Sequence, residues 1–308
     1  MSDGEPVSIV GIGAMGTAIA SRLLSEGARV TVWNRNPAKC ESLVAAGAVR
    51  ASTFEQALDA SPLVISCLIS SSVAQHLLQQ QRPASALAGK TFVDTSTSTP
   101  ADVQRLAAQV ATLGGEYLDA KLMFYPSQVG SDASRMFLSG PRDIYSRFSD
   151  VFASIVGETR YVGDDPRRAS VLYTAVWNYY YSGLFGFLEA LALVATSGMD
   201  AREFLEQALA STNDLAGHLR DAAQRIATGR LDGDQAAVDV YIDGFATMAT
   251  TFDDVGVRSR MLPSLSALSS LAHNGGYGRS DIASVTRALL DSSASGADPS
   301  VPDRLRRA

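Results

Sequence analysis

The sequence predicts an α/β fold: a doubly wound, mainly parallel sheet, then a long helix and a C-terminal all-α domain. Three observations predict this class. Short apolar runs alternate with helical patterns between residues 7 and 160, a glycine motif follows the first apolar run, and a long apolar stretch without proline follows Pro166. The 308 residues fit about two domains, at roughly 100–200 residues each.

The N-terminal half supplies the expected sheet. Short apolar runs predict strands at 7–12, 28–33, 62–68, 90–95, 115–120, 135–140 and 158–163. Several of these runs are almost continuously hydrophobic, as strands buried on both faces require. Helical patterns lie between them at 14–26, 37–46, 53–60, 71–80 and 100–113. This alternation predicts one doubly wound domain over residues 1–163.

A different pattern begins at Asp165, a plausible N-cap that places Pro166 at the first helical position. The helix expected over 164–197 is apolar on too many sides to stand alone, so it must be buried. Further helices are expected around 200–228, 233–256, 258–273 and 279–292. Because these helices can cover little of the long helix, we expect a homodimer built on it, with a dimerisation domain over 198–294. The last residues, 295–308, are expected to form a disordered tail.

Composition excludes several classes of partner. The net charge is −6 and basic residues do not cluster, so nucleic acid is not an expected partner. The sequence contains no run of about 18 apolar residues, so no membrane span is expected. Cys40 and Cys67 lack the spacing of metal ligands, so no metal is expected. The N-terminal segment lacks a basic stretch followed by an apolar one, which makes the cytoplasm the expected location.

A glycine motif carries the first functional signal. The segment Gly11-Ile12-Gly13-Ala14-Met15-Gly16 is a G-x-G-x-x-G that follows a strand and opens a helix, the context of a Rossmann dinucleotide site. Gly11 allows the tight turn, Gly13 admits the pyrophosphate and Gly16 lets the helix approach the strand. The pyrophosphate would sit at the helix N-terminus. The alternative is a purely structural glycine turn.

The end of the second predicted strand selects the nicotinamide cofactor. Enzymes that use NAD place Asp or Glu there for the ribose 2′-hydroxyl, but this chain has Asn34. Arg35 and Lys39, with Asn36 between them, offer cations to a 2′-phosphate. The missing carboxylate matters as much as the cations, because it would repel that phosphate. We therefore expect NADP(H), unless Arg35 is only a solvated turn residue.

Three motifs together resemble the β-hydroxyacid dehydrogenase superfamily. They are Gly11–Gly16, residues 34–39 (NRNPAK) and residues 94–100 (DTSTSTP). Two further motifs of that superfamily are altered here. The loop that grips a substrate carboxylate reads Asp-Ala-Lys-Leu-Met-Phe-Tyr-Pro over 119–126, and the position of the catalytic lysine holds Ala169. The acid–base group of hydroxyacid chemistry is therefore missing.

Both departures resemble one branch, the imine reductases. The resemblance is most specific over 117–140 and continues through 163–166, 186–193 and 229–234, so that it covers nearly the whole chain. It implies an NADPH-dependent homodimer with a Rossmann domain, a long interdomain helix and a helical domain swapped with the partner. It also implies reduction of cyclic imines, with reductive amination of ketones in some members, and a small-molecule imine or amine as partner.

The resemblance also assigns roles to residues. Alignment through Gly186-Phe187-Leu188 puts Tyr173 at the catalytic position, as in the tyrosine branch, and Thr97 beside the nicotinamide. Trp177 and Tyr181 lie four and eight residues further along the helix, near the same face. The expected site residues are as follows: catalytic Tyr173 and Thr97; substrate pocket Met123, Tyr125, Trp177 and Tyr181; cofactor site Gly11, Ile12, Gly13, Ala14, Met15, Gly16, Asn34, Arg35, Asn36, Lys39, Cys67, Leu68 and Thr97.

Several alternatives stay open at this stage. The aromatic side chains could simply pack in a dimer core, and the Thr97 hydroxyl could hold its loop. Two residues depart from the imine reductase pattern: Asp94 replaces the common Asn, and Lys121 replaces a small residue. Lys121 is either an unusual acid in the pocket or the partner of Asp119 or Asp94 in a salt bridge. For the whole chain, the rivals to imine reduction are a dehydrogenase or reductase acting on another carbonyl and a catalytically silent NADPH-binding protein.

Overall fold

The computed structural model describes residues 6–81 and 86–295. The chain divides into two compact units, Met1–Asn178 and Tyr179–Ala308, and each is described by itself. The tail expected over 295–308 lies outside the described residues, apart from Ser295 at the end of the last helix.

The first unit is built on one eight-stranded sheet with the order β3-β2-β1-β4-β5-β6-β7-β8. Neighbouring strands are parallel except β6 and β7. The strands are β1 (Val7–Val10), β2 (Val30–Trp33), β3 (Val49–Arg50), β4 (Leu63–Ser66), β5 (Thr91–Asp94), β6 (Glu116–Leu122), β7 (Arg135–Ser139) and β8 (Glu158–Tyr161). The predicted fold class, a doubly wound and mainly parallel sheet before a helical domain, is confirmed.

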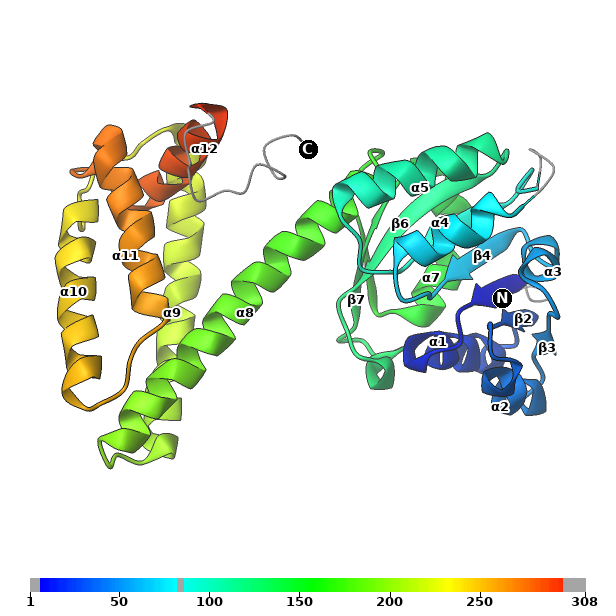
Figure 1. Ribbon diagram of the computed structural model, residues 1–308, viewed down its shortest axis with the longest axis horizontal. Helices are drawn as coiled ribbons and strands as arrows, with labels where there is room; N and C mark the ends of the chain where they lie inside the picture. The colour runs from blue at the N-terminus through cyan, green and yellow to red at the C-terminus, as the bar shows by residue number, and fades with distance from the viewer. Residues whose placement is uncertain (1–5, 82–85, 296–308) are drawn as a thin grey trace. The chain divides into compact units, whose positions relative to one another are not determined.

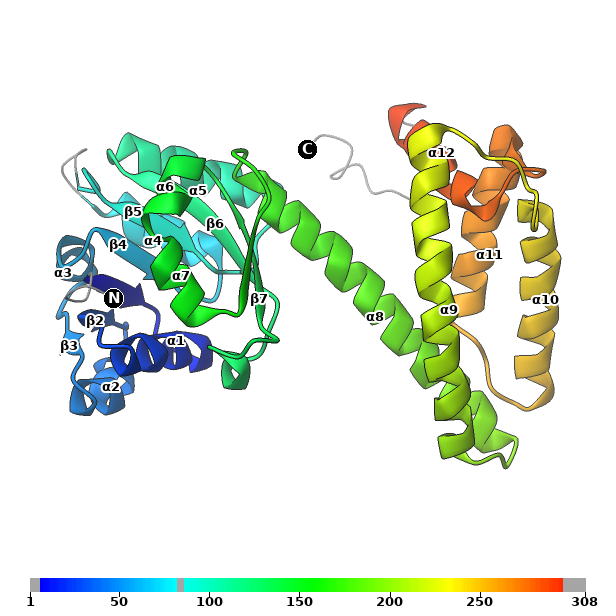
Figure 2. The same cartoon turned by 180° about the vertical axis from the view of Figure 1, so that it is seen from behind.

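Helices cover both faces of this sheet (Figures 1 and 2). They are α1 (Ala14–Ser25), α2 (Glu41–Ala45), α3 (Phe54–Asp59), α4 (Ser71–Gln79), α5 (Pro100–Thr112), α6 (Arg142–Arg147) and α7 (Ser149–Ile155). One apolar core joins the sheet to α1 and α7, and a second joins it to α3, α4 and α5. Side chains alternate between the two cores along a strand, so Ile9 enters the first and Val10 the second.

Some predicted elements of this unit were wrong in detail. Strand β3 was not predicted, because it is only two residues long and both side chains are exposed. Helices α6 and α7 were not predicted either. The helix expected over 37–46 is split into a 3₁₀ turn (Pro37–Cys40) and the short helix α2.

The long helix α8 (Arg167–Thr196) begins where the sequence indicates. The carboxylate of Asp165 accepts a hydrogen bond from the Arg167 backbone N–H at 3.0 Å, which satisfies one of the free amides of the first turn. Of the whole helix, only Ala169 and Ser170 are fully buried within a single chain. Most of its apolar side chains are therefore at least partly exposed among the described residues.

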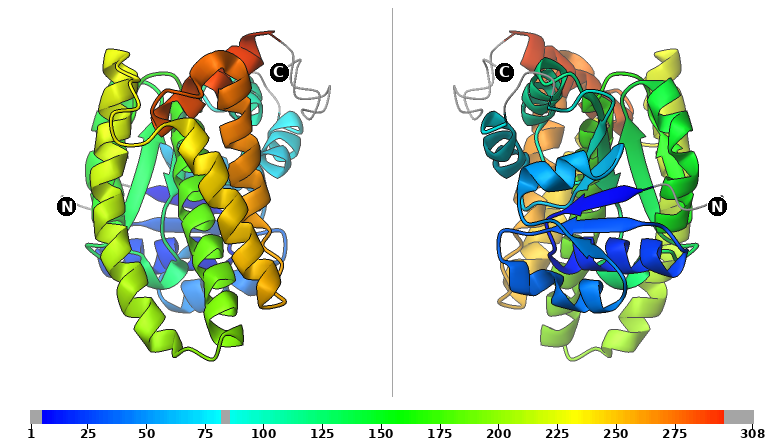
Figure 3. Two further views of the ribbon diagram at one scale, coloured as in Figure 1. Left: turned by 90° about the vertical axis from the view of Figure 1, so that its left-hand side faces the viewer. Right: turned by 90° about the vertical axis from the view of Figure 1, so that its right-hand side faces the viewer.

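The second unit consists of helices and contains α9 (Ala201–Thr228), α10 (Val238–Asp254), α11 (Met261–Ala272) and α12 (Val285–Ser295). Helices α10 and α11 pack side by side (Figures 1 and 3). The prediction of a helix from residue 233 was wrong, because residues 233–237 form a loop. Arg225 ties this loop down through the carboxylate of Asp234 at 2.6 Å and the carbonyl of Asp232 at 3.0 Å. Among the described residues, no helix is both long and apolar enough to cross a membrane.

Candidate active site

The glycine motif forms the turn between β1 and α1. Gly11 has φ +94°, and a Cβ atom there would lie 2.7 Å from the carbonyl oxygen of Cys67. A Cβ atom on Gly16 would lie 2.1 Å from the carbonyl oxygen of Gly11, so the helix could not approach the strand with any side chain there. Gly13 faces open space, with no atom within 4 Å of such a Cβ. The turn is therefore tight where the chain packs and open where a ligand would approach.

The first turn of α1 is arranged to receive an anion. Gly13 is the N-cap and supplies no side chain to cap the helix. The amides of the first turn have no partner inside the helix, and Gly13 and Ala14 are exposed while Met15 is half-buried. Free N–H groups at a helix N-terminus, together with the helix dipole, bind a pyrophosphate well.

Asn34 links this turn to the end of β2. Its Oδ1 accepts a hydrogen bond from the Ile12 backbone N–H at 3.0 Å, and its amide nitrogen donates to the carbonyl of Asn36 at 3.0 Å. Asn36 in turn accepts from the Ala38 backbone N–H at 3.2 Å. Asn34 thus shapes the cofactor loop without adding negative charge. Because the Ile12 amide is already engaged, Ile12 supports the turn through its buried side chain.

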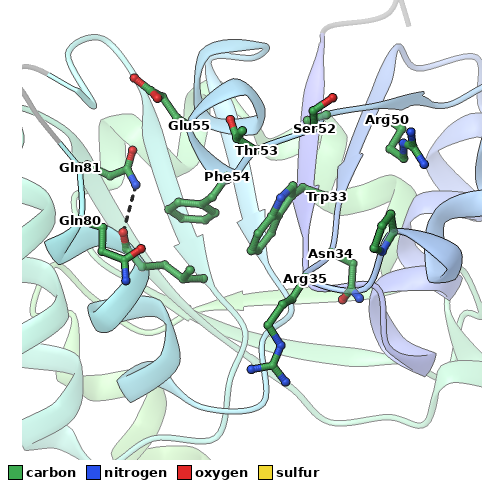
Figure 4. A pocket seen from close by; sticks show the side chains of 13 residues that line it. Trp33, Asn34, Arg35, Arg50, Ser52, Thr53, Phe54, Glu55, Gln80 and Gln81 are labelled. Atoms are coloured by element: carbon green, nitrogen blue, oxygen red, sulfur yellow. Dashed lines mark hydrogen bonds between the residues drawn. The ribbon is translucent and has the colours of Figure 1, made fainter.

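A pocket of about 690 Å³ lies next to this loop, at the carboxyl ends of β2 and β3 (Figure 4). Trp33 and Phe54 meet edge to face at its centre, with ring centroids 5.2 Å apart. Arg35, which follows β2, and Arg50, at the end of β3, both line the pocket. Glu55 is the one acidic side chain among the lining residues. Arg35 therefore lies where the sequence predicts a cation, and Arg50 is a second cation that sequence reasoning missed. Lys39 is exposed but does not line the pocket.

Cys67 and Leu68, at the end of β4, pack against the glycine turn. Burial raises the pKa of the Cys67 thiol to about 12, against the smaller opposing effect of the Thr95 hydroxyl that donates to its sulfur. The thiol is therefore neutral and unreactive at physiological pH. The residue contributes shape to the site.

Thr97 lies on the loop that joins β5 to α5. Its side chain is exposed, whereas Ser96 is buried and Ser98 is half-buried. The loop ends at Thr99, which exchanges hydrogen bonds with Asp102 in a capping box for α5. Because β1, β4 and β5 are parallel, their carboxyl ends share one edge of the sheet, so this loop stands at the same edge as the glycine turn.

A buried polar network supports the Thr97 loop from below. The Lys121 ammonium contacts Asp119 Oδ1 at 2.8 Å, the Ser96 carbonyl at 2.6 Å and Ser98 Oγ at 2.8 Å. Of the alternatives for Lys121, the salt bridge to Asp119 is thus the one formed. Burial raises the pKa of Asp119 to about 6, even though Lys121 pulls it down.

Tyr173 lies on α8, one turn beyond Ser170. It is half-buried, and its ring meets that of Trp177 edge to face with centroids 6.1 Å apart. Ala169, at the position where hydroxyacid dehydrogenases carry a lysine, is fully buried, and its backbone N–H donates to Ser139 Oγ at 3.0 Å. A methyl side chain there can neither donate nor accept a proton.

The remaining expected pocket residues are more exposed. Met123 follows β6 and is half-buried, while Tyr125 is 67% exposed. Tyr181 belongs to the second unit, is 45% exposed and has its ring 5.5 Å from that of Tyr180.

Comparison with known proteins accounts for both parts of the chain. Residues 6–163 match the NAD binding domain of 6-phosphogluconate dehydrogenase, and residues 165–291 match the C-terminal domain of the NADPH-dependent reductive aminase-like family. The NADPH-dependent reductive aminase of Aspergillus oryzae is 29% identical over 283 residues, which cover 91% of this chain and 95% of that protein.

Two solved structures show the same architecture. The imine reductase from Pseudomonas sp. superimposes with a TM-score of 0.86 at 32% identity, covering 93% of this chain and 99% of the other. The imine reductase from Aspergillus terreus in complex with NADPH4 and dibenz[c,e]azepine gives a TM-score of 0.87 at 31% identity, with the same coverage.

Proposed function

The chain belongs to the imine reductase family of the β-hydroxyacid dehydrogenase superfamily, and we propose that it reduces a cyclic imine with Tyr173 as the proton donor. It is an NADPH-dependent oxidoreductase that acts on C=N bonds. The observation that carries the proposal is the replacement of the acid–base lysine by the buried Ala169, with Tyr173 one turn further along α8.

The residues of the cofactor site fit NADP(H). The open space at Gly13 and the exposed first turn of α1 suit a pyrophosphate, and Arg35 and Arg50 suit a 2′-phosphate. Asn34 holds the loop that an acidic residue would hold in an NAD enzyme. When bound, NADPH supplies the hydride that the imine carbon accepts.

The proton would come from the Tyr173 hydroxyl. A phenol hydroxyl can donate a proton to an amine nitrogen or anchor it through a hydrogen bond. Thr97 would hold the nicotinamide side of the site. The ring of Trp177, edge-on to Tyr173, would offer its face to a cationic iminium.

We further propose that a second copy of the chain completes the substrate pocket. Among its described residues, the second unit has a small apolar core of Val238, Ala272 and Ala288, with the partly buried Ile242, Leu271, Tyr277, Ile282 and Val285 packed against it. Large apolar side chains on α8 and α9 remain exposed in the single chain, namely Tyr179, Tyr180, Leu184, Phe185, Leu188, Leu205, Leu209, Leu215 and Leu219. Apolar surface of this extent marks an interface. A swapped helical domain would cover it and would also enclose Tyr125 and Tyr181.

The proposal is tested by mixing the purified chain with NADPH and a five-membered cyclic imine of the 2-methylpyrroline type. We expect oxidation of NADPH and release of the cyclic amine. A ketone supplied with a primary amine tests whether the same site couples the two. A 3-hydroxy acid supplied with NADP⁺ should give no reduced cofactor, because Ala169 cannot act as its base; turnover of that acid would instead support a hydroxyacid dehydrogenase.

A further inference from the structure

Lys121 is a buried lysine to which the proposed function assigns no role in cofactor binding or in proton transfer. Its side chain is 1% exposed, in the middle of the sheet on β6. A lysine ammonium has three donors and no acceptor, and a buried one is stable only when its donors are paired. Lys121 pairs all three, with Asp119, the Ser96 carbonyl and Ser98 Oγ.

Two of these three partners flank Thr97 directly. The ammonium donates to the backbone carbonyl of Ser96, before Thr97, and to the side-chain hydroxyl of Ser98, after it. These two hydrogen bonds hold the base of the loop together. Asp94 holds the same loop from β5, where its carboxylate accepts from Ser96 Oγ at 2.7 Å and from Ser71 Oγ at 3.0 Å. Thr97 itself is left exposed at the apex.

The Thr97 loop is also joined to α8. The carbonyl of Ser98 accepts a hydrogen bond from Ser170 Oγ at 2.5 Å. Lys121 therefore binds Ser98, whose carbonyl joins the Thr97 loop to the helix that carries Tyr173. A continuous set of contacts runs from β6, through Ser98, to α8.

The charges explain why a lysine is present. Asp94 and Asp119 are register partners on adjacent parallel strands, so both carboxylates point to the same face of the sheet, and both are fully buried. Lys121, two residues beyond Asp119 on its strand, faces the same side. Lys121 therefore supplies a positive charge to a face of the sheet that carries two buried carboxylates.

We propose that Lys121 is a positioning residue that holds the Thr97 loop against α8. The loop beside the nicotinamide and the helix that carries Tyr173 then keep a fixed position relative to each other. The proposal rests on the proposed function. It predicts that loss of the ammonium loosens the loop and lowers the rate of the chemical step more than it weakens cofactor binding. A displacement of about 1 Å in such a site is worth about 100-fold in rate.

The test compares Lys121→Met, which keeps an unbranched side chain one atom shorter and removes the donors, with Lys90→Met. Lys90 lies at the start of β5, binds the carbonyl of Asp59 at 3.3 Å and has no contact with the Thr97 loop. The readouts are hydrogen exchange of the amides of Ser96, Thr97 and Ser98, the dissociation constant for NADPH, and kcat and KM for a cyclic imine. We expect faster exchange at these amides, a fall in kcat of roughly 10–100-fold and an NADPH dissociation constant within about threefold of the unmodified chain for Lys121→Met alone.

If Lys121→Met does not fold, the double variant Lys121→Met/Asp119→Asn removes the buried charge together with its partner and is measured in its place. Unchanged exchange and unchanged kcat in the variant that folds would overturn the proposal. Loss of NADPH binding in proportion to kcat would also overturn it, because that result indicates general damage to the site. Exchange needs no substrate, so the proposal is tested even if the unmodified chain reduces no imine, a result that would contradict the proposed function alone.

Discussion

Ser170 Oγ donates a 2.5 Å hydrogen bond to the carbonyl oxygen of Ser98, across 72 positions of sequence. This contact joins the loop that presents Thr97 to the first buried turn of α8. Tyr173 follows one turn later on the same helix. Thr97 is expected to face the nicotinamide and Tyr173 the substrate nitrogen. The hydrogen bond between Ser98 and Ser170 therefore links the loop of the first to the helix of the second, within the first unit.

The cofactor preference is tested at Arg35. Loss of a charge-assisted hydrogen bond to phosphate costs about 1.5–3 kcal/mol, or roughly 10–150-fold. Arg35→Ala should raise the KM for NADPH by such a factor and leave the KM for NADH unchanged, because NADH has no 2′-phosphate. Arg105→Ala, which alters a surface arginine paired with Asp102, is the control. Equal use of NADPH and NADH by the unmodified chain would contradict the assignment.

Tyr173→Phe isolates the hydroxyl, since the aromatic ring and its contact with Trp177 are kept. If the hydroxyl protonates or anchors the nitrogen, kcat should fall by about 10²–10⁴-fold, while the dissociation constant for NADPH stays the same. If the iminium forms in solution, the fall should be smaller and confined to high pH. Wild-type turnover across pH 6–9 would mean that Tyr173 only packs.

The assembly is tested by light scattering. One chain has a mass of 32.5 kDa, and we expect twice that mass in solution. The interface should exceed about 2,000 Å², as obligate interfaces do. Phe185→Glu places a charge on the exposed apolar face of α8 and should give monomers with little activity. A stable and active monomer of the unmodified chain would rule out the shared substrate pocket.

Asp119 makes stability depend on pH. Burial raises its pKa from 3.8 to about 6, so between these values the folded chain holds a proton that the unfolded chain has released. The protonated Asp119 therefore stabilises the folded chain, and this contribution to the free energy of unfolding is fully present below pH 3.8. It is lost as the pH rises through 6. The advantage of the unmodified chain over Asp119→Asn should shrink by about 1–3 kcal/mol between pH 4 and pH 7, measured by urea unfolding. A difference that does not change with pH would contradict the raised pKa.

The sheet could be predicted because several strands are near-continuous apolar runs, such as Val7–Val10 and Leu63–Ser66, which suit strands buried on both faces, and because helical patterns alternate with them. Strand β3 escaped prediction because two exposed residues carry no periodicity. Arg50 was missed for the same reason, since its place in the pocket beside Arg35 depends on the pairing of β3 with β2. The spacing of glycines, by contrast, predicted the tight turn between β1 and α1, because the shape of that turn depends on the absence of side chains.

The sequence predicted a salt bridge from Lys121 to Asp119 or Asp94, but it could not decide between these two partners. Asp94 and Asp119 are equivalent candidates, because they are register partners in neighbouring strands. The choice between them depends on side-chain geometry: the two hydroxyls of Ser71 and Ser96 already satisfy one Asp94 oxygen, whereas Asp119 faces the ammonium directly. Long-range contacts such as these decide which charge is paired and leave little trace in local sequence.

The central claim is tested most directly by following the hydride. The purified chain is given NADPH that carries deuterium at C4 of the nicotinamide, on each face in turn, together with a cyclic imine. We predict that one of the two labelled cofactors gives a cyclic amine with a single deuterium at the former imine carbon, and that one amine forms for each NADPH oxidised. The claim would be contradicted by a chain that binds NADPH but returns the imine unlabelled, or by deuterium found only in the alcohol from an added 3-keto acid.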